Sequence, residues 1–451
     1  MTLFTSLLKD PIGALIEAHI EEMSPFRIVE HRIPCSYIRD FPGAVATDDS
    51  DQLHLAVKQY LPLDNPTPRP GDVTIIGAHA NGFPKELYEP LWEDLLARSK
   101  QHNFRIRSIW IADMAHQGQS SVENELLLGN DPGWFDHSRD LLHMINLKRD
   151  DMPRPIVGIG HSCGGAQLVH ISLWNPRLFA SLILIDPVIQ QRSAEIDPQS
   201  TKPNLAQLST FRREVWPSRR EAAESFARSK FYQSWDKRVL DRWVQYGLRD
   251  LPTVLHPEEQ PAGAPPQVTL TSTIGHEVHT YLRPNFEGYG THTGKPVNRL
   301  THPDLDPNRP GTYPFYRAEP QRTYDRLPEV RPSVLYIFGG KSDTSNASTN
   351  ESKLAATGTG PGGSGGRAEG RVKGVTFEEV GHLVAMEAAE RTAAECAKWM
   401  DGELGRWGEE ERKWRATWEG MSLREKQVPS ERFKEMLGGD PRKKTKKESK
   451  I

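Results

Sequence analysis

Short apolar runs alternate with longer amphipathic segments along much of the chain. Five runs are strand-sized and rich in β-branched residues, at 72–79, 106–113, 155–161, 180–186 and 333–340. Between them, residues 86–102 and 136–148 have the apolar spacing of helices. Residues 26–35 and 52–61 alternate apolar and polar positions, which is typical of antiparallel strands at a sheet edge. This pattern predicts the α/β class, with a mostly parallel central sheet flanked by helices.

One long stretch interrupts this alternation. Residues 187–331 are too many for a connection between two strands, and they contain helix-like segments at 204–216 and 220–248. We therefore expect an insertion at 187–331 in a core formed by residues 1–186 and 332–401.

Two further segments differ from the core in composition. Residues 345–370 are rich in Gly, Ser and Thr, which predicts a flexible surface loop within the core. Residues 402–451 are strongly charged, and we expect a C-terminal helix followed by a basic tail.

Composition excludes several classes of protein. A net charge of -3 and a pI near 6.6 give no basic character for binding nucleic acid. The three cysteines, Cys35, Cys163 and Cys396, are too far apart for a disulfide framework and suit a reducing compartment. No apolar run approaches the roughly 20 residues that cross a bilayer, and the first residues lack a basic leader. We expect an intracellular protein without a transmembrane segment.

The stretch GIGHSCGG at Gly158–Gly165 has two possible functions. A phosphate-binding G-x-G-x-x-G turn would need a glycine where Cys163 stands. The alternative, G-x-S-x-G, is matched by Gly160, Ser162 and Gly164 between an apolar strand and an apolar helix. Such a turn holds a serine in a strained conformation that small neighbours must accommodate. The sequence predicts a nucleophile at Ser162, with the backbone N–H of Cys163 facing a developing oxyanion.

A nucleophilic serine needs an acid and a histidine further along the chain. Asp343 follows the strand at 333–340, and His382 precedes an apolar helix, so both would lie at the sheet edge that carries Ser162. We expect Asp343 to orient His382. Asp186, which follows the strand at 180–186, remains a rival acid.

Other polar and aromatic groups carry a weaker signal. His276 and His279 flank Glu277, but the spacing is not H-E-x-x-H and no third ligand is evident, so we expect neither metal nor cofactor. Six aromatic residues of the insertion would either line an acyl pocket or pack as a local core, and we favour packing: Trp216, Phe226, Phe231, Tyr232, Trp235 and Trp243.

Together the elbow and its partners resemble the α/β-hydrolase superfamily. Residues 77–84 resemble its oxyanion loop, which implies the backbone N–H of Asn81 as a second oxyanion donor. Residues 113–120 resemble its D-x-x-G-H-G-x-S turn only in part, because His116 and Gln117 depart from G-H-G while Gly118 and Ser120 keep its small residues. The resemblance also implies that the insertion at 187–331 is a cap. Serine at the elbow argues against the related epoxide hydrolases and haloalkane dehalogenases, which have aspartate there.

A narrower resemblance links residues 134–142, the segment 231–249 and the final tripeptide to fungal peroxisomal lipase-like and toxin-biosynthesis hydrolases. The tripeptide Ser449-Lys450-Ile451 differs from the peroxisomal address S-K-L only in its last residue. We expect these three residues to bind the peroxisomal import receptor and the protein to reach the peroxisomal matrix.

These features predict a serine hydrolase of lipase, esterase or thioesterase type. It would cleave a small-molecule hydrophobic ester or acyl thioester through an acyl-enzyme intermediate. Two alternatives stay open: an acyltransferase that uses the same acyl-enzyme, and a non-catalytic binding protein of the same fold.

Overall fold

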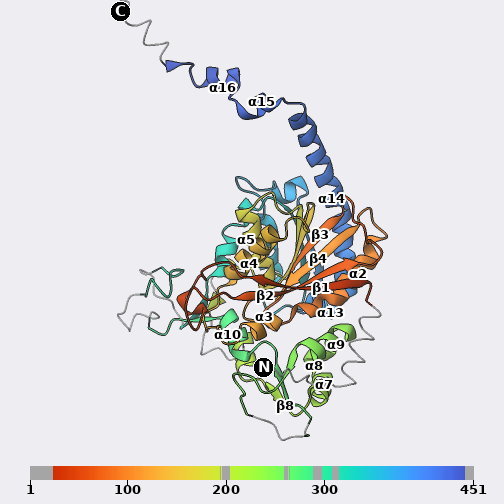
Figure 1. The fold of residues 1–451 in the computed structure, drawn as a ribbon, viewed down its shortest axis with the longest axis vertical. Coiled ribbons are helices and arrows are strands. Elements are labelled where there is room, and N and C mark those ends of the chain that lie inside the picture. The colour runs from red at the N-terminus through yellow and green to blue at the C-terminus, as the bar shows by residue number, and fades with distance from the viewer. Residues whose placement is uncertain are drawn as a thin grey trace, which may run out of the picture. The chain divides into compact units, whose positions relative to one another are not determined.

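The structure is a computed structural model, and its chain divides into two units, Met1–Asp401 and Gly402–Ile451 (Figure 1). It describes residues 24–192, 194–195, 204–258, 263, 265–287, 297–306 and 314–441. The second unit begins where the charged C-terminal segment begins in the sequence.

An eight-stranded sheet in the order β1-β2-β4-β3-β5-β6-β13-β14 forms the centre of the first unit (Figure 1). Its strands are β1 (Phe26–Pro34), β2 (His54–Pro62), β3 (Val73–Ala78), β4 (Ile106–Ala112), β5 (Ile156–His161), β6 (Ser181–Ile185), β13 (Ser333–Gly339) and β14 (Val372–Phe377). The pairs β1–β2 and β2–β4 are antiparallel, and all the other pairs are parallel. The predicted fold class and the seven predicted strands are confirmed.

Burial explains why these runs form the sheet. Every position of β3, β5, β6 and β13 is buried, as expected of parallel strands that helices cover on both faces. The edge strand β1 is instead partly exposed at most of its positions, which is why its sequence mixes apolar and charged residues. The difference between continuous and mixed apolar runs therefore marks the centre and the edge of the sheet.

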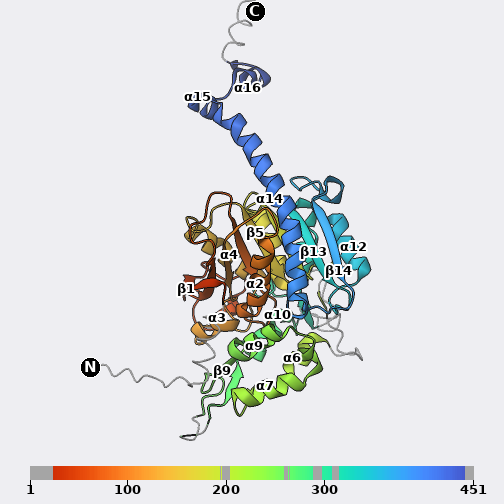
Figure 2. The same ribbon diagram turned by 90° about the vertical axis from the view of Figure 1, so that its right-hand side faces the viewer.

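Helices from the predicted segments cover the two faces of the sheet. On one face α4 (Trp134–Leu147) and α5 (Cys163–Trp174) pack side by side, and on the other lies α2 (Glu89–Ser99) (Figures 1 and 2). Buried side chains of α4 and α5 join those of the sheet in one hydrophobic core. Shorter helices are η1 (Pro42–Ala44), η2 (Lys85–Tyr88), α3 (Gly118–Glu123), η3 (Leu327–Glu329) and α13 (Val384–Glu387).

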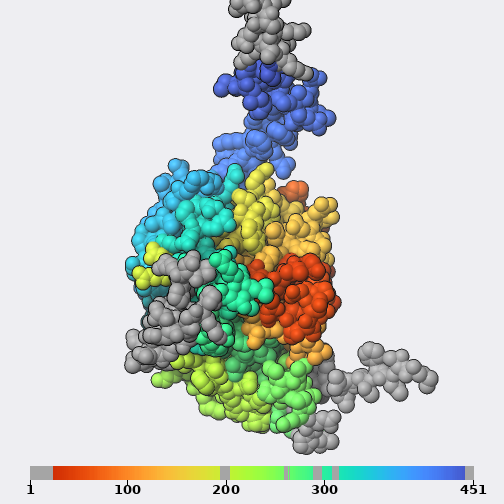
Figure 3. Space-filling model, turned by 90° about the vertical axis from the view of Figure 1, so that its left-hand side faces the viewer, coloured from red at the N-terminus to blue at the C-terminus, as the bar shows by residue number. Residues whose placement is uncertain are grey.

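The insertion contains two small sheets, of strand order β8-β10-β9 and β11-β12-β7, and several helices. The strands are β7 (Ala194–Glu195), β8 (Val215–Trp216), β9 (Leu248–Asp250), β10 (Val268–Leu270), β11 (Arg283–Pro284) and β12 (Phe315–Arg317). The helices are α6 (Leu205–Thr210), α7 (Arg219–Arg228), α8 (Lys230–Gln233), α9 (Lys237–Tyr246), α10 (Ile274–Tyr281) and α11 (Glu319–Tyr324). Residues of the insertion, yellow-green to green, form the surface at the lower end of this unit in Figure 3.

Both helices predicted within the insertion are shorter in the structure. The segment 204–216 is helical only as far as Thr210 and ends in the strand β8. The segment 220–248 is divided among α7, α8 and α9. Ser229 has an extended backbone after α7, and the Asp236 carboxylate caps α9 by accepting the backbone N–H of Arg238. These two polar residues interrupt the helical pattern that the apolar spacing alone suggests.

The six aromatic residues singled out in the insertion pack against one another in one cluster, and four of them are buried. Trp216 and Phe226 meet edge to face with ring centroids 5.3 Å apart. Tyr232 meets Trp235 edge to face and stacks on Trp243. Phe231, in contrast, is half exposed. The packing interpretation is therefore confirmed for this cluster.

The segment 345–370, predicted to be a loop throughout, contains the helix α12 (Ala347–Ala356) and the short helix η4 (Gly366–Glu369). That prediction is wrong, because Asn346 caps α12 by accepting the backbone N–H of Thr349 and Leu354 packs against the hydrophobic core. Composition did not reveal these two anchors.

The C-terminal segment is helical over much of its described length. It contains the end of α14 (Ala389–Glu419), α15 (Leu423–Gln427) and α16 (Glu431–Met436). The tripeptide Ser449-Lys450-Ile451 lies outside the described residues. Among the helices that are described, none is long and apolar enough to cross a membrane.

Replacing the cap of α12 tests whether this helix depends on Asn346. We predict that Asn346→Ala lowers the local stability of α12 by about 1 kcal/mol, the usual contribution of a side-chain cap. Amide hydrogen exchange within residues 347–356 should then become about fivefold faster. Ser348→Ala, an exposed change in the same turn, is the control. Equal exchange rates in the Asn346 variant and the wild type would contradict the prediction.

Candidate active site

Ser162 lies at a sharp turn between β5 and α5. Its backbone angles, φ 58° and ψ −121°, belong to a strained region, and its N–H is held by the carbonyl of Ile185 at 2.9 Å. The neighbouring glycines permit this turn. A Cβ atom at Gly160 would lie 2.6 Å from the carbonyl oxygen of Gly164, and one at Gly164 would lie 2.3 Å from that of Ala78. No side chain fits at either glycine without displacing backbone.

His382, in the loop between β14 and α13, contacts both Ser162 and Asp186. Its Nε2 lies 2.9 Å from Ser162 Oγ, and its Nδ1 lies 2.6 Å from Asp186 Oδ2. These contacts join residues 220 and 196 positions apart in the chain. With Nδ1–H donated to the carboxylate, Nε2 is left to accept the serine proton. The three side chains therefore have the arrangement of a nucleophile, a base and an orienting acid.

The structure corrects the expected position of the acid. Asp343 is exposed in the loop after β13, and the carboxylate beside His382 is that of Asp186, which follows β6. The residues on either side of Asp343 point the other way. The hydroxyls of Ser342 and Thr344 donate to Asp186 Oδ2, so Asp343 between them faces solvent. The loop predicted to supply the acid supplies hydrogen bonds to it instead.

Hydrogen bonds keep Asp186 ionised although it is buried. Burial alone would raise the pKa of this carboxyl, but His382, the Ser342 hydroxyl and the backbone N–H of Gly339 together lower it below its usual value. Lys353 is also buried nearby, and its Nζ donates to the carbonyl of Pro187 at 3.3 Å. Burial lowers the pKa of Lys353 to about 8, and the negative charge of Asp186 opposes this shift.

His161, which the G-x-S-x-G motif treats as a variable position, forms a hydrogen-bonded link beside the nucleophile. Its Nε2 lies 3.0 Å from the backbone carbonyl of His382, and its Nδ1 lies 2.9 Å from Tyr88 Oη. Tyr88 Oη also accepts the backbone N–H of Ala80 at 2.8 Å. Burial and the neighbouring His382 lower the pKa of His161 to about 3, so its ring is neutral. Nothing in the sequence indicated this role of Tyr88.

The loop expected to supply the second oxyanion donor lies against the nucleophile turn. Asn81 is buried after β3, and its backbone N–H faces the thiol of Cys163, the first residue of α5. Burial raises the pKa of this thiol to about 12, although backbone N–H groups favour the thiolate. Cys163 is therefore a protonated, buried side chain, and its neighbourhood contains both of the expected donors.

The two histidines at positions 276 and 279 belong to α10, where the carboxylate between them is bound by other side chains. Glu277 between them is buried and binds Arg212, and it accepts the Ser209 hydroxyl at 2.6 Å. Over the part of the chain that the structure describes, no group of three or more potential metal ligands was found.

The sheet order, the strained serine and the Ser162–His382–Asp186 contacts define the class of this protein. The profile of the alpha/beta hydrolase family matches residues 75–395, and the chain belongs to that family. It is thus a hydrolase.

Curated relatives extend the similarity over most of the chain. This chain is 40% identical over 408 residues to the type I acyl-CoA thioesterase mpaH of Penicillium roqueforti (strain FM164). The aligned region covers 88% of this chain and 92% of that protein. The abhydrolase domain-containing protein AFT2-1 of Alternaria alternata is 27% identical over 297 residues, 63% of this chain and 98% of that one.

Among solved structures, the peroxisomal alpha-beta-hydrolase Lpx1 of Saccharomyces cerevisiae has a TM-score of 0.61 and 18% identity. The match covers 84% of this chain and 89% of that one. At this identity the likeness concerns the fold.

Two matched substitutions test which carboxylate serves the histidine. We predict that Asp186→Asn lowers kcat for ester hydrolysis by ~10⁴-fold, because an amide cannot stabilise the imidazolium or hold the required tautomer of His382. Asp343→Asn should leave kcat within about twofold of wild type, as expected of an exposed change outside the site. Steady-state hydrolysis of a p-nitrophenyl ester measures both, and the reverse order of effects would contradict the assignment.

Proposed function

We propose that this protein is a serine thioesterase that cleaves acyl-CoA esters with a hydrophobic acyl group through an acyl-enzyme intermediate. The observation that carries the proposal is the pair of contacts made by His382, 2.9 Å to Ser162 Oγ and 2.6 Å to Asp186 Oδ2. The Penicillium relatives are named acyl-CoA thioesterases, which supports the choice of a thioester.

In the first half of the proposed reaction, Ser162 Oγ attacks the thioester carbonyl while His382 Nε2 accepts its proton. The carbonyl oxygen becomes an oxyanion that accepts the backbone N–H groups of Asn81 and Cys163. Collapse of this intermediate breaks the carbon–sulfur bond, and the leaving thiolate takes the proton from His382 Nε2. Asp186 remains a carboxylate and stabilises the imidazolium that forms between these steps.

The second half repeats these steps with water as the nucleophile. His382 Nε2 accepts a proton from water, whose oxygen attacks the acyl carbon on Ser162. The second oxyanion collapses with cleavage of the bond to Oγ, and the imidazolium returns its proton to the serine. The products are a carboxylic acid and the regenerated enzyme.

Aromatic residues beside the oxyanion loop support a hydrophobic acyl group. Phe83, two residues after Asn81, meets the rings of Trp235 and Trp243 edge to face with centroids 5.6 Å and 5.9 Å apart. The insertion thus brings apolar rings close to the loop that would hold the carbonyl oxygen. Such surroundings favour an apolar chain over a charged one.

Transfer of the acyl group to an alcohol or amine is the alternative outcome of the same acyl-enzyme. Neither the triad nor the oxyanion donors distinguish water from another nucleophile. The convergence of Ser162, His382 and Asp186 favours both enzymatic functions over a non-catalytic binding protein.

An acyl-CoA panel tests this proposal. We predict release of free CoA with kcat/KM rising from short to medium or long acyl chains, and labelling of Ser162 by a fluorophosphonate probe. Ser162→Ala should abolish both, because it removes the nucleophile. Product analysis with and without an added alcohol or amine separates hydrolysis from transfer. Folded wild-type protein that neither reacts with the probe nor releases CoA would refute the proposal.

We further propose that the protein acts in the peroxisomal matrix, addressed by Ser449-Lys450-Ile451. The support is the similarity of this tripeptide to S-K-L and the lysine-rich run that precedes it. An import receptor would read a small residue, a basic residue and an aliphatic residue that carries the free carboxylate.

A fluorescent protein extended by residues 438–451 tests the address. We predict that this fusion colocalises with a peroxisomal marker in a fungal cell, and that the same fusion without the last three residues is cytosolic. Changing Lys450 to Glu, which reverses the charge that the receptor would read, should also release it. An unchanged punctate distribution after deletion would contradict the address.

A further inference from the structure

Gln117 is fully buried between the loop that follows β3 and the cap helix α10. Its Oε1 accepts the backbone N–H of Gly82 at 2.8 Å. Its Nε2 donates to Asn81 Oδ1 at 2.6 Å and to Thr280 Oγ1 at 3.1 Å. Both ends of the amide are thus occupied, and the loop and the helix share one side chain.

On the loop side, Gln117 fixes the peptide groups around the proposed oxyanion donor. The backbone N–H of Gly82, just after Asn81, is held by Gln117, and that of Ala80, just before it, is held by Tyr88 Oη. The peptide groups on both sides of Asn81 are thus held by buried side chains. Oxyanion donors act only when they are aimed at the position where the charge develops.

On the cap side, α10 holds the same loop a second time. Asn81 Nδ2 donates to the backbone carbonyl of Glu277 at 3.0 Å. The Thr280 hydroxyl, which accepts from Gln117, itself donates to the carbonyl of His276 at 2.8 Å. The Asn81 side chain is consequently bound at one end by Gln117 and at the other by α10.

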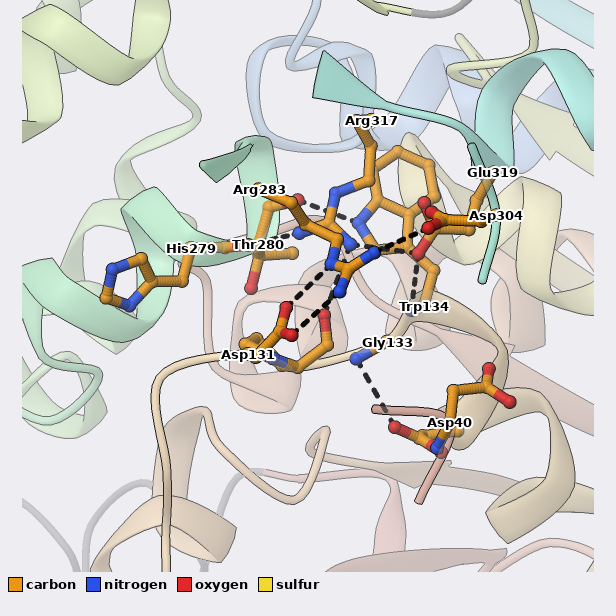
Figure 4. Close-up of polar contacts among 12 residues, drawn as sticks. Asp40, Asp131, Gly133, Trp134, His279, Thr280, Arg283, Asp304, Arg317 and Glu319 are labelled. Carbon is orange, nitrogen blue, oxygen red and sulfur yellow. Dashed lines mark hydrogen bonds and ion pairs between the residues drawn. The ribbon is translucent and has the colours of Figure 1, made fainter. Parts of the chain in front are cut away.

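Buried contacts anchor the end of α10 to the core (Figure 4). Trp134 Nε1 donates to the carbonyl of Thr280 at 2.8 Å, and Arg317 donates to that of His279. Arg317 also binds Glu319 at 2.9 Å, and Glu319 accepts the backbone N–H of Trp134 at 3.2 Å. Because these groups are buried, α10 is a firm support for the loop that contains Asn81.

A second arginine ties the strand after α10 to the core. Arg283 on β11 makes a bidentate pair with Asp131 and also binds Asp304 at 2.7 Å (Figure 4). The same guanidinium lies 3.3 Å from the ring centroid of Phe41. Bidentate geometry restricts the position of an arginine more than a single contact does.

We propose that Gln117 is a positioning residue that aims the backbone N–H of Asn81 at the oxyanion and couples this donor to the cap helix α10. The inference rests on the proposed acyl-transfer function. It also gives a role to a position of the D-x-x-G-H-G-x-S turn at which Gln117 stands in place of the histidine. A side chain without an amide there would leave Asn81 Oδ1, the N–H of Gly82 and Thr280 without this partner.

The first test compares Gln117→Ala with wild type in acyl-CoA hydrolysis. We expect kcat to fall by about 10- to 100-fold with KM within about threefold, because the loss concerns the transition state and not substrate binding. Affinity for a trifluoromethyl ketone, whose adduct with serine carries an oxyanion, should fall in parallel. The apparent pKa of the base in the pH profile should stay unchanged, since His382 is untouched.

Gln167→Ala is the matched control, because Gln167 is an equally buried glutamine that does not contact the loop. For Gln167→Ala, we expect the affinity for the trifluoromethyl ketone, relative to the KM for acyl-CoA, to equal that of wild type. Equal losses in the two alanine variants would mean that the effect is one of packing, and would overturn the proposal.

Gln117→Glu keeps the shape of the side chain and addresses the possibility that the alanine variant does not fold. An ionised carboxylate would still accept from Gly82 but would face Asn81 Oδ1 without a proton to donate. Protonation restores a donor, so the activity of this variant relative to wild type should rise as the pH falls through the pKa of the buried carboxyl. A ratio that is flat with pH, or an unchanged kcat in both Gln117 variants, would overturn the proposal.

The wild-type protein separates this inference from the proposed function. If wild type neither reacts with a fluorophosphonate nor hydrolyses acyl-CoA, the proposed function fails. If wild type does both and the Gln117 variants match it, only the role of Gln117 fails.

Discussion

The close contact between the nucleophile turn and the end of β3 is the constraint on which the site depends. Gly164 approaches the carbonyl of Ala78 so closely that a Cβ atom would lie 2.3 Å from that oxygen. This contact brings the first turn of α5 against the loop that follows β3, next to Ser162 with its φ of 58° and ψ of −121°. The helix start and the strand end thus meet backbone to backbone. The side chains of Tyr88 and Gln117 then hold the peptide groups of the loop beside this contact.

The sequence predicted the strands and the sharp turn at Ser162 because both depend on local patterns. Buried parallel strands must be apolar at every position, and the turn at Ser162 must have glycines beside it, so each feature is visible in a few residues. The acid was predicted at Asp343 because the chain order of serine, acid and histidine permits two strand ends. Only the three-dimensional arrangement shows that the carboxylate of Asp186 faces His382 while Asp343 faces solvent.

Features that depend on distant contacts were missed for the same reason. Composition suggested a loop at 345–370, but one cap at Asn346 and one buried contact at Leu354 are enough to form a helix there. The link from Tyr88 through His161 to the carbonyl of His382 joins three segments with no shared motif. Gln117 was noted only as a mismatch in a family turn, because its contacts with Asn81, Gly82 and Thr280 come from segments far apart in the chain.

The position of α10 has a consequence for how this protein diverges from its relatives. A cap is commonly regarded as an interchangeable part, which evolution or an engineer can replace to obtain a new substrate while the chemistry stays in the core. Here one helix of the insertion holds the side chain of Asn81 through the carbonyl of Glu277. A chimera that exchanged residues 187–331 would therefore alter the geometry of the loop that contains Asn81, unless the new insertion preserved this helix and the partners of Gln117.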